Sequence, residues 1–308
     1  MHAGLEMILF LDWTSQSLHA LRVSESGVVI DRRQSSDGAL AAAGDHESRV
    51  SALAGDWLVD SDAIYIAGMA TGRGGWRETG YVAAPAGLSA LLPHMIPLTL
   101  STGKTAHFLP GLSAAGNLPD VMRGEEIKAF GCACEGRQLV VVPGRHSKWI
   151  RMEGERILHF GTFLSGEVLA LVRRDSIVSR LIPDGSEVTE HGLKQGVETA
   201  RARRDSGAGI LRMLFSARSR VLNGTLDPAD IAGYLEGLAI GCEIIEAWSE
   251  FQPAETPVTL IGSLDICDRY AAALAAFGVR AESRDGHEAG ARAIAKILRV
   301  ANIWNPCS

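Results

Sequence analysis

Residues 138–147 read QLVVVPGRHS, an apolar run rich in valine that ends in a polar turn. The apolar run predicts a buried strand, and the proline, glycine and serine predict the turn after it. Residues 7–17, MILFLDWTSQS, have the same form near the start of the chain. Two further short strands are predicted after each turn, at 18–23 and 28–33 and again at 148–152 and 156–163. The sequence therefore predicts two three-stranded meanders, each opening with a strand and a polar turn.

The elements that follow each meander also come in a similar order. A helix at 47–57 and a buried strand at 63–68 are predicted after the first meander, and a helix over 119–134 leads to the second. The remaining predicted elements are helices at 187–215 and 228–251, a strand at 257–261, a helix at 268–277, a strand at 279–283 and a helix at 287–300. We interpret the repeated order as an internal duplication, which predicts an α/β fold of two similar halves with a ligand cleft between them.

Composition narrows the function classes. The 308 residues are 46% hydrophobic, and 30 Lys and Arg against 36 Asp and Glu give a net charge of −6. This balance argues against a nucleic-acid partner, which needs a concentrated basic surface. No apolar run reaches the ~18 residues that cross a bilayer, and the apolar start lacks a cationic leader, so we expect no membrane association and a cytoplasmic protein. Five cysteines without paired spacing predict reduced thiols, with neither a disulfide framework nor a zinc site.

The two polar turns are candidate phosphate-binding loops. Successive backbone N–H groups and hydroxyls in a turn can hold phosphate oxygens, and Asp12 at the end of the first strand is a suitable carboxylate for Mg²⁺. The sequence has neither GxxxxGK[ST] nor GxGxxG after a strand, so the P-loop and dinucleotide-binding routes are not supported. Taken alone, Asp12 is better explained as a residue that caps its turn, and it is the pair of similar turns that favours the metal-binding interpretation.

Several short segments resemble those of 2-dehydro-3-deoxygalactonokinases. The most specific are residues 120–126, DVMRGEE, and residues 143–149, PGRHSKW. The others are Ala67-Gly68-Met69, Gly75-Trp76, Ala84-Pro85-Ala86, Ser165-Gly166-Glu167, Ala289-Gly290 and residues 292–295. The resemblance implies the actin-like sugar-kinase (ASKHA) fold of two ribonuclease-H-like halves. It places the sugar-acid side in residues 1–136, joined by a C-terminal helix at 287–301, and the nucleotide side in residues 137–286.

The resemblance also implies an activity and its cofactors. Such enzymes use ATP and Mg²⁺ to phosphorylate the 6-hydroxyl of 2-dehydro-3-deoxy-D-galactonate in galactonate catabolism. A carboxylate that accepts the hydroxyl proton is expected among Glu125, Glu126, Asp120 and Glu167, with Glu125 first. A cation for the sugar-acid carboxylate is expected at Arg73 in the glycine-rich loop beside Trp76, or at Arg123. The expected ATP and metal contacts are Asp12, Thr14, Ser15, Gly144, Arg145, Ser147, Lys148, Gly262 and Ser263.

The phosphate turns depart from the family pattern. Thr14 stands where the family usually has glycine, His19 where it has arginine, and Arg145 where it has threonine. Thr14 narrows the backbone conformations of the first turn, whereas Arg145 adds a charge suited to phosphate. Two alternatives therefore stay open: a non-catalytic binder of sugar acid or nucleotide, and a kinase for another 2-keto-3-deoxy acid. A homodimer is among the assemblies that the sequence leaves open.

Overall fold

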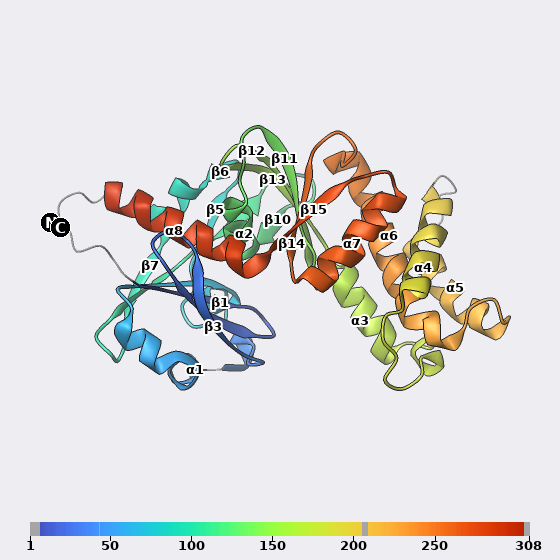
Figure 1. Cartoon of the computed structure of the whole chain (residues 1–308), viewed down its shortest axis with the longest axis horizontal. Helices are drawn as coiled ribbons and strands as arrows, with labels where there is room; N and C mark the ends of the chain where they lie inside the picture. Colours follow the sequence, from blue (N-terminus) through green and yellow to red (C-terminus); the bar gives the residue numbers. More distant parts are fainter. Residues whose placement is uncertain (1–6, 43, 205–208, 305–308) are drawn as a thin grey trace. The chain divides into compact units, whose positions relative to one another are not determined.

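The computed structural model describes residues 7–42, 44–204 and 209–304, and it contains two large mixed sheets (Figure 1). The first sheet has the strand order β3-β2-β1-β4-β8-β7. Strand β1 lies at its centre, is buried along its whole length, and pairs antiparallel with β2 and parallel with β4. Such burial on both faces explains the unbroken apolar run of its sequence. The strands are β1 (Ile8–Trp13), β2 (Leu18–Val23), β3 (Val29–Ser35), β4 (Ala63–Gly68), β7 (Ile96–Thr99) and β8 (Thr105–Phe108).

The second large sheet repeats the topology of the first. Its order is β15-β14-β11-β12-β13-β6, so the run β13-β12-β11-β14 matches β3-β2-β1-β4 strand for strand. Strand β11 pairs parallel with β14, as β1 does with β4. The duplication predicted from element order is present in the sheets. The strands are β6 (Ala86–Gly87), β11 (Arg137–Val142), β12 (Ser147–Glu153), β13 (Arg156–Phe163), β14 (Val258–Gly262) and β15 (Ala281–Asp285).

A small third sheet was not predicted from the sequence. It has the order β10-β9-β5 and is built from β5 (Tyr81–Ala83), β9 (Gly111–Ala114) and β10 (Asp120–Met122). Asp120 therefore begins a strand, and the prediction of one helix over 119–134 is wrong. The physical reason is Gly124, whose φ of +104° separates strand β10 from the helix that starts at Glu125.

The helices largely follow the predicted segments, except that one predicted helix is divided and α3 was not predicted. The predicted helix 187–215 is wrong as a single element, because α4 ends at Ala202 and α5 starts at Ile210, after Gly209. Helices α4 and α5 both pack on α6 (Figure 1). The bounds are α1 (His46–Asp60), α2 (Glu125–Gly131), α3 (Ser165–Asp175), α4 (Glu190–Ala202), α5 (Ile210–Leu222), α6 (Ile231–Phe251), α7 (Leu264–Ala276) and α8 (Gly286–Trp304).

The chain divides into two compact units. The first contains residues 1–137, 150–160 and 284–308, and the second contains 138–149 and 161–283. The boundaries expected from the sequence remain a prediction, and each unit is described by itself below. The C-terminal helix α8 belongs to the first unit, where Gly290 lies against the Phe10 ring and Gly27 against the backbone of Arg292.

Other sequence expectations concern cysteines and membranes. Cys242 is a free thiol, Cys132 Sγ lies 3.7 Å from Arg292 Nη2, and Cys307 lies outside the described residues. The helix expected to run to residue 134 ends at Gly131. Cys132 and Cys134 therefore both lie beyond it, contrary to the prediction. Within the part of the chain that the structure describes, no helix is both long and apolar enough to cross a bilayer.

Candidate active site

The first polar turn follows β1 and is closed by its own side chains. The Thr14 hydroxyl oxygen accepts the backbone N–H groups of Gln16, at 3.1 Å, and of Ser17, at 3.0 Å. The backbone N–H of Thr14 donates to the Ser17 carbonyl at 2.9 Å. Ser15 and Gln16 are exposed at the tip. Three backbone amides of this turn are thus engaged within it, and a phosphate that used the Gln16 and Ser17 N–H groups would first have to displace the Thr14 hydroxyl.

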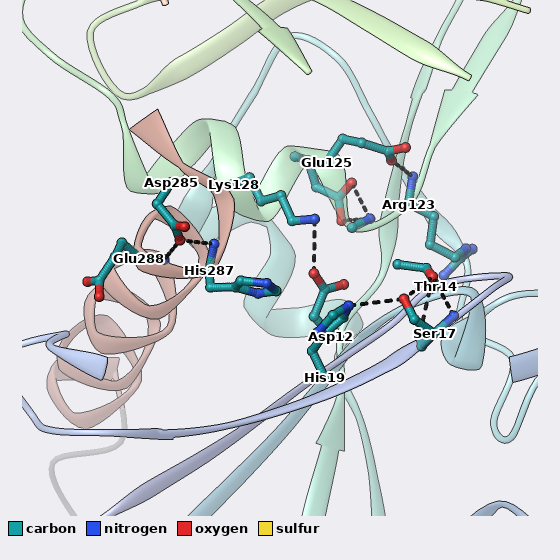
Figure 2. A network of polar contacts seen from close by, with 12 residues as sticks. Asp12, Thr14, Ser17, His19, Arg123, Glu125, Lys128, Asp285, His287 and Glu288 are labelled. Carbon is teal, nitrogen blue, oxygen red and sulfur yellow. Dashed lines mark hydrogen bonds and ion pairs between the residues drawn. The ribbon is translucent and has the colours of Figure 1, made fainter. Parts of the chain in front are cut away.

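Asp12 lies just before this turn and is paired with a lysine that the sequence analysis did not select. The Lys128 Nζ on α2 is 2.9 Å from Asp12 Oδ2, and the Asp12 side chain is only 4% exposed (Figure 2). Burial raises the pKa of Asp12, but the Lys128 ammonium outweighs it and holds that pKa below its ordinary value. The same pair raises the pKa of Lys128 although burial lowers it. Both groups are therefore charged at neutral pH.

Two histidines lie beside this ion pair. The ring centroids of His19, on β2, and His287, at the start of α8, are 4.6 Å apart (Figure 2). Burial lowers the pKa of each ring, and the charge of His287 lowers the pKa of His19 further, whereas Asp12 partly opposes the lowering of the His287 pKa. The His19 Nε2 lies 3.0 Å from Ser17 Oγ, which links this ring to the end of the first turn. At neutral pH these rings contribute polar nitrogen atoms and no net positive charge.

The start of α2 carries two of the predicted carboxylates, and both fold back on the backbone. The Arg123 N–H donates to Glu125 Oε2 at 3.0 Å (Figure 2). The Gly124 N–H donates to both Glu126 oxygens, at 2.9 and 2.8 Å. Glu125 is half-buried, whereas Glu126 is 1% exposed. Burial, followed by the charge of Glu125, raises the pKa of Glu126 to about 7.

This raised pKa predicts a pH-dependent stability difference. A carboxyl with a pKa of 4.5 when unfolded and about 7 when folded makes the folded protein bind the extra proton between those values. The stability of the wild type therefore falls as pH rises through that range, by about 3 kcal/mol from this group. The free energy of unfolding of Glu126→Gln minus that of the wild type should therefore be about 3 kcal/mol larger at pH 8 than at pH 5. Urea unfolding at both pH values measures the difference; a constant difference would contradict the assignment.

Arg123 ties α2 to the glycine-rich loop at residues 71–80. Its Nη1 donates to the Thr71 carbonyl and hydroxyl oxygens at 2.8 Å and to Thr79 Oγ1 at 2.6 Å, and its Nη2 donates to the carbonyls of Thr79 and Gly80 at 3.2 Å. The guanidinium also lies 4.3 Å from the centroid of the Tyr81 ring. These contacts engage the guanidinium within the protein. Its predicted role in binding substrate stays a prediction.

The other two predicted residues of that loop, Arg73 and Trp76, have different surroundings. Arg73 is exposed and has no hydrogen-bond or ion-pair partner among the residues that the structure describes. The Trp76 ring packs into the core of the first unit, stacked on His46 and edge-on to Phe108. Arg73 is thus available to an anionic ligand, while Trp76 anchors the loop. Asp120 lies at the start of β10, where its side chain accepts the Val121 N–H.

In the second unit, the turn after β11 is held by the start of α3. Glu167 lies 3.4 Å from Arg145 Nη2 and 2.5 Å from His146 Nε2. The hydrogen bond from His146 lowers the pKa of Glu167, whose side chain is half-buried. A Cβ at Gly166 would overlap the Gly144 carbonyl, so the helix lies directly against the turn. Glu167, predicted as a possible base, is engaged with two side chains of the predicted phosphate turn.

The remaining predicted nucleotide contacts also lie in the second unit. Gly144 is exposed at the tip of the turn, and Ser147 is buried at the start of β12. The Lys148 ammonium donates to the His146 carbonyl at 3.0 Å, and its side chain is buried. Gly262 ends β14 and Ser263 is the exposed residue that precedes α7. The structure places these residues on two neighbouring strand ends, because β11 and β14 pair in parallel.

Lys128 and His287 are the site residues that the sequence analysis missed. Lys128 follows Glu125 by three residues, so the two share one face of α2, which is a signal that the sequence contained. His287 had no such signal. Its position beside Asp12 depends on the return of α8 to the first unit, nearly the whole length of the chain away.

Asp12 has the chemistry of a magnesium ligand, with one restriction. Mg²⁺ is commonly held by one or two carboxylates together with substrate phosphates and water, so a single carboxylate at a strand end fits. No cluster of three or more His, Cys, Asp or Glu side chains suited to a metal occurs among the described residues. One Asp12 oxygen is already bound to Lys128 Nζ. The residues fit a metal that is held mainly by phosphate oxygens.

Comparison with known proteins agrees on one family. Residues 12–297 match the family model of 2-keto-3-deoxy-galactonokinase. A relative from Rhizobium meliloti (strain 1021), named probable 2-dehydro-3-deoxygalactonokinase, is 32% identical over 96% of both chains. The 2-dehydro-3-deoxygalactonokinase of Escherichia coli (strain K12) is 29% identical over 92% of this chain and 96% of its own.

Solved structures support the same conclusion. A crystal structure from Sinorhizobium meliloti, described as that of a 2-dehydro-3-deoxygalactonokinase, has a TM-score of 0.80 at 30% identity and covers 97% of this chain and 100% of its own. The activator of 2-hydroxyisocaproyl-CoA dehydratase from Clostridium difficile, with bound ADPNP, has a TM-score of 0.55 at 10% identity over 98% of both chains. At that identity the likeness shows the fold alone, which is the two-lobed actin-like ATPase and sugar-kinase fold. The chain belongs to the 2-keto-3-deoxy-galactonokinase family.

Proposed function

We propose that this protein transfers the γ-phosphoryl group of ATP to the 6-hydroxyl of 2-dehydro-3-deoxy-D-galactonate. The observation that carries the proposal is the family match over residues 12–297, which includes both polar turns and the start of α2. Membership of a kinase family with an actin-like fold implies that a nucleotide and a small molecule are bound. The particular sugar acid and the need for Mg²⁺ are part of the proposal.

Each unit contributes a distinct set of groups. In the second unit, Gly144, Arg145 and Ser147 of the turn would hold ATP phosphates, with Lys148 adding positive charge, and Gly262 and Ser263 would contact the adenosine. In the first unit, Asp12 would hold Mg²⁺, with Thr14 and Ser15 beside it. When bound, Mg²⁺ neutralises charge on the phosphate oxygens. Lys128 keeps Asp12 ionised and ready for that contact.

The acceptor side is formed by α2 and the glycine-rich loop. We assign the general base to Glu125, because it is half-buried, whereas both oxygens of the buried Glu126 accept the Gly124 N–H. Arg73 is the exposed cation suited to the substrate carboxylate. Trp76 and Arg123 would hold the loop in place, and Arg123 gives it positive charge. Asp120 and Glu167 are the secondary candidates for the base.

One observation favours a second candidate function, that of a non-catalytic binder. The Thr14 hydroxyl takes the N–H groups of Gln16 and Ser17, which a phosphate would need in the first turn. A chain with that turn closed would keep its sugar-acid side while losing the ability to position the γ-phosphate.

An ADP-release assay separates the candidates. Purified protein is given ATP, Mg²⁺ and either 2-dehydro-3-deoxy-D-galactonate or its gluconate epimer. We expect ADP release that depends on Mg²⁺ and is faster with the galactonate acid. Faster release with the epimer would identify a kinase for another 2-keto-3-deoxy acid. Release at the level of a no-enzyme control, with measurable sugar-acid binding by calorimetry, would support the binder.

A further inference from the structure

A buried carboxylate in the second unit has no part in the roles assigned above. Glu243 lies in the middle of α6 and is 2% exposed. It accepts hydrogen bonds from Trp149 Nε1 at 2.8 Å, from Tyr270 Oη at 2.9 Å and from Ser165 Oγ. These partners, taken from the described residues, are all neutral. Burial raises the pKa of Glu243, and the hydrogen bonds from Ser165, Trp149 and Tyr270 lower it only in part.

The network extends from Glu243 to the second polar turn. Tyr270 has one hydroxyl proton and donates it to the carboxylate. In the 2.9 Å contact between the two hydroxyls, Ser147 is therefore the donor and Tyr270 the acceptor. The Ser147 oxygen is left to accept, and the Gly144 N–H donates to it at 3.4 Å. The carboxylate thus orients the Tyr270 and Ser147 hydroxyls that lead from α6 to the turn, where Ser147 Oγ also lies 3.4 Å from the Gly144 carbonyl oxygen.

A second arm of the network reaches the same turn from the other side. Ser165 is the first residue of α3, and the next residue, Gly166, lies against the Gly144 carbonyl and Arg145 Cα. The Glu167 N–H then donates to the Arg145 carbonyl at 3.0 Å. Because the Ser165 hydroxyl is bound to Glu243, the carboxylate fixes the first turn of α3 as well as Ser147.

We propose that Glu243 is a positioning residue for nucleotide binding, which holds the 143–148 turn in shape through Ser147 and Ser165. The proposal rests on the proposed function, in which this turn binds ATP phosphates. Burying a carboxylate among neutral donors costs free energy of desolvation, and an apolar side chain of similar size would fill the same space without that cost. Filling the core therefore does not explain a glutamate at this position. Its distinctive effect is to orient two hydroxyl groups that frame the turn.

The test compares two buried glutamates of one helix. Glu236 lies seven residues before Glu243 on α6, is 6% exposed, and pairs with Arg269 at 2.6 Å and with Arg173 at 3.9 Å. In Glu243→Gln, the amide NH₂ cannot accept from the donors that it faces. We expect its Kd for ADP by calorimetry and its KM for ATP to rise about ten-fold, with the KM for the sugar acid within about two-fold of wild type. Glu236→Gln should lower the melting temperature and leave the ADP Kd within about two-fold.

Milder variants keep the test decisive if Glu243→Gln does not fold. Tyr270→Phe removes one donor and the link to Ser147, and Ser165→Ala removes the other hydroxyl; each should raise the ADP Kd by a smaller factor. If the folded variants melt earlier but bind ADP as the wild type does, Glu243 is a core residue only and the inference is wrong, while the kinase proposal stands. If the wild type itself binds no ADP and releases none, both fail together.

Discussion

The Asp12→Asn variant should lose turnover by about 10²-fold or more, because the change removes the charge that would hold Mg²⁺ while keeping the side-chain volume. The structure adds a second effect. Lys128 Nζ lies 2.9 Å from the Asp12 carboxylate, so the change leaves a largely buried ammonium without its partner. Breaking such a pair costs about 3 kcal/mol of folding stability. We therefore expect lower kcat across a Mg²⁺ titration together with a lower melting temperature.

A double variant separates these two effects. Asp12→Asn combined with Lys128→Met removes both charges, so the melting temperature should return toward that of the wild type while turnover stays low. Recovery of turnover along with stability would show that Asp12 acts only as the partner of Lys128. An unchanged kcat in the single variant, at every Mg²⁺ concentration, would remove Asp12 from the active site.

Glu125→Gln should lower kcat by about 10²-fold or more with little change in the KM for the sugar acid, because it keeps the shape of the side chain but loses the basic oxygen. The same change at Glu126 should have a small effect on kcat, since both Glu126 oxygens accept the Gly124 N–H at the start of α2. The two variants make the same change at neighbouring positions of α2, so each serves as a control for the other. Initial rates at saturating ATP and sugar acid, from pH 5 to pH 9, measure both.

The pH profile distinguishes the two carboxylates independently of the variants. A base works only when deprotonated, and the pKa of Glu126 is raised to about 7. If Glu126 were the base, kcat would therefore fall to half of its maximum near that pH and would fall further at lower pH. If Glu126→Gln loses activity and kcat of the wild type falls below about pH 7, the general base is Glu126 and not Glu125. Near-normal rates in Glu125→Gln, Glu126→Gln, Asp120→Asn and Glu167→Gln alike would mean that no carboxylate base is needed.

The large sheets could be predicted because their strands carry a local signal. Strand β4 has the predicted bounds, and β1 and β11 begin within a residue of their predicted starts, since continuous apolar runs indicate strands that are buried on both faces. The small sheet β10-β9-β5 was missed, because its strands are three or four residues long and depend on pairing with distant segments. A three-residue strand at Asp120 has too little periodicity to be told from the start of a helix.

The site was predicted in parts and not as an arrangement. Asp12, Glu125 and the second polar turn follow from short motifs, and the structure gives them defined partners. What the sequence lacked was the pairing across elements. Nothing local shows that Lys128 meets Asp12 or that Glu243 reaches Ser147 through Tyr270, because the Asp12–Lys128 and Ser147–Tyr270 contacts each join residues more than 100 positions apart.

Helix α8 is the last helix of the chain, yet it packs within the first unit, where Gly131 lies directly against the Ala289 backbone and Gly290 against Phe10. A ribosome makes residues 284–304 after every residue of the second unit. The first unit therefore cannot complete its core until α8 has been made, whereas the second unit has all of its residues by 283. Domains that are contiguous in sequence commonly fold from the N-terminus onward during translation. In this protein the second unit is the first to have all of its residues, so the unit that contains Asp12 waits for α8, and a stop codon before α8 leaves that unit incomplete even though most of its sequence is present.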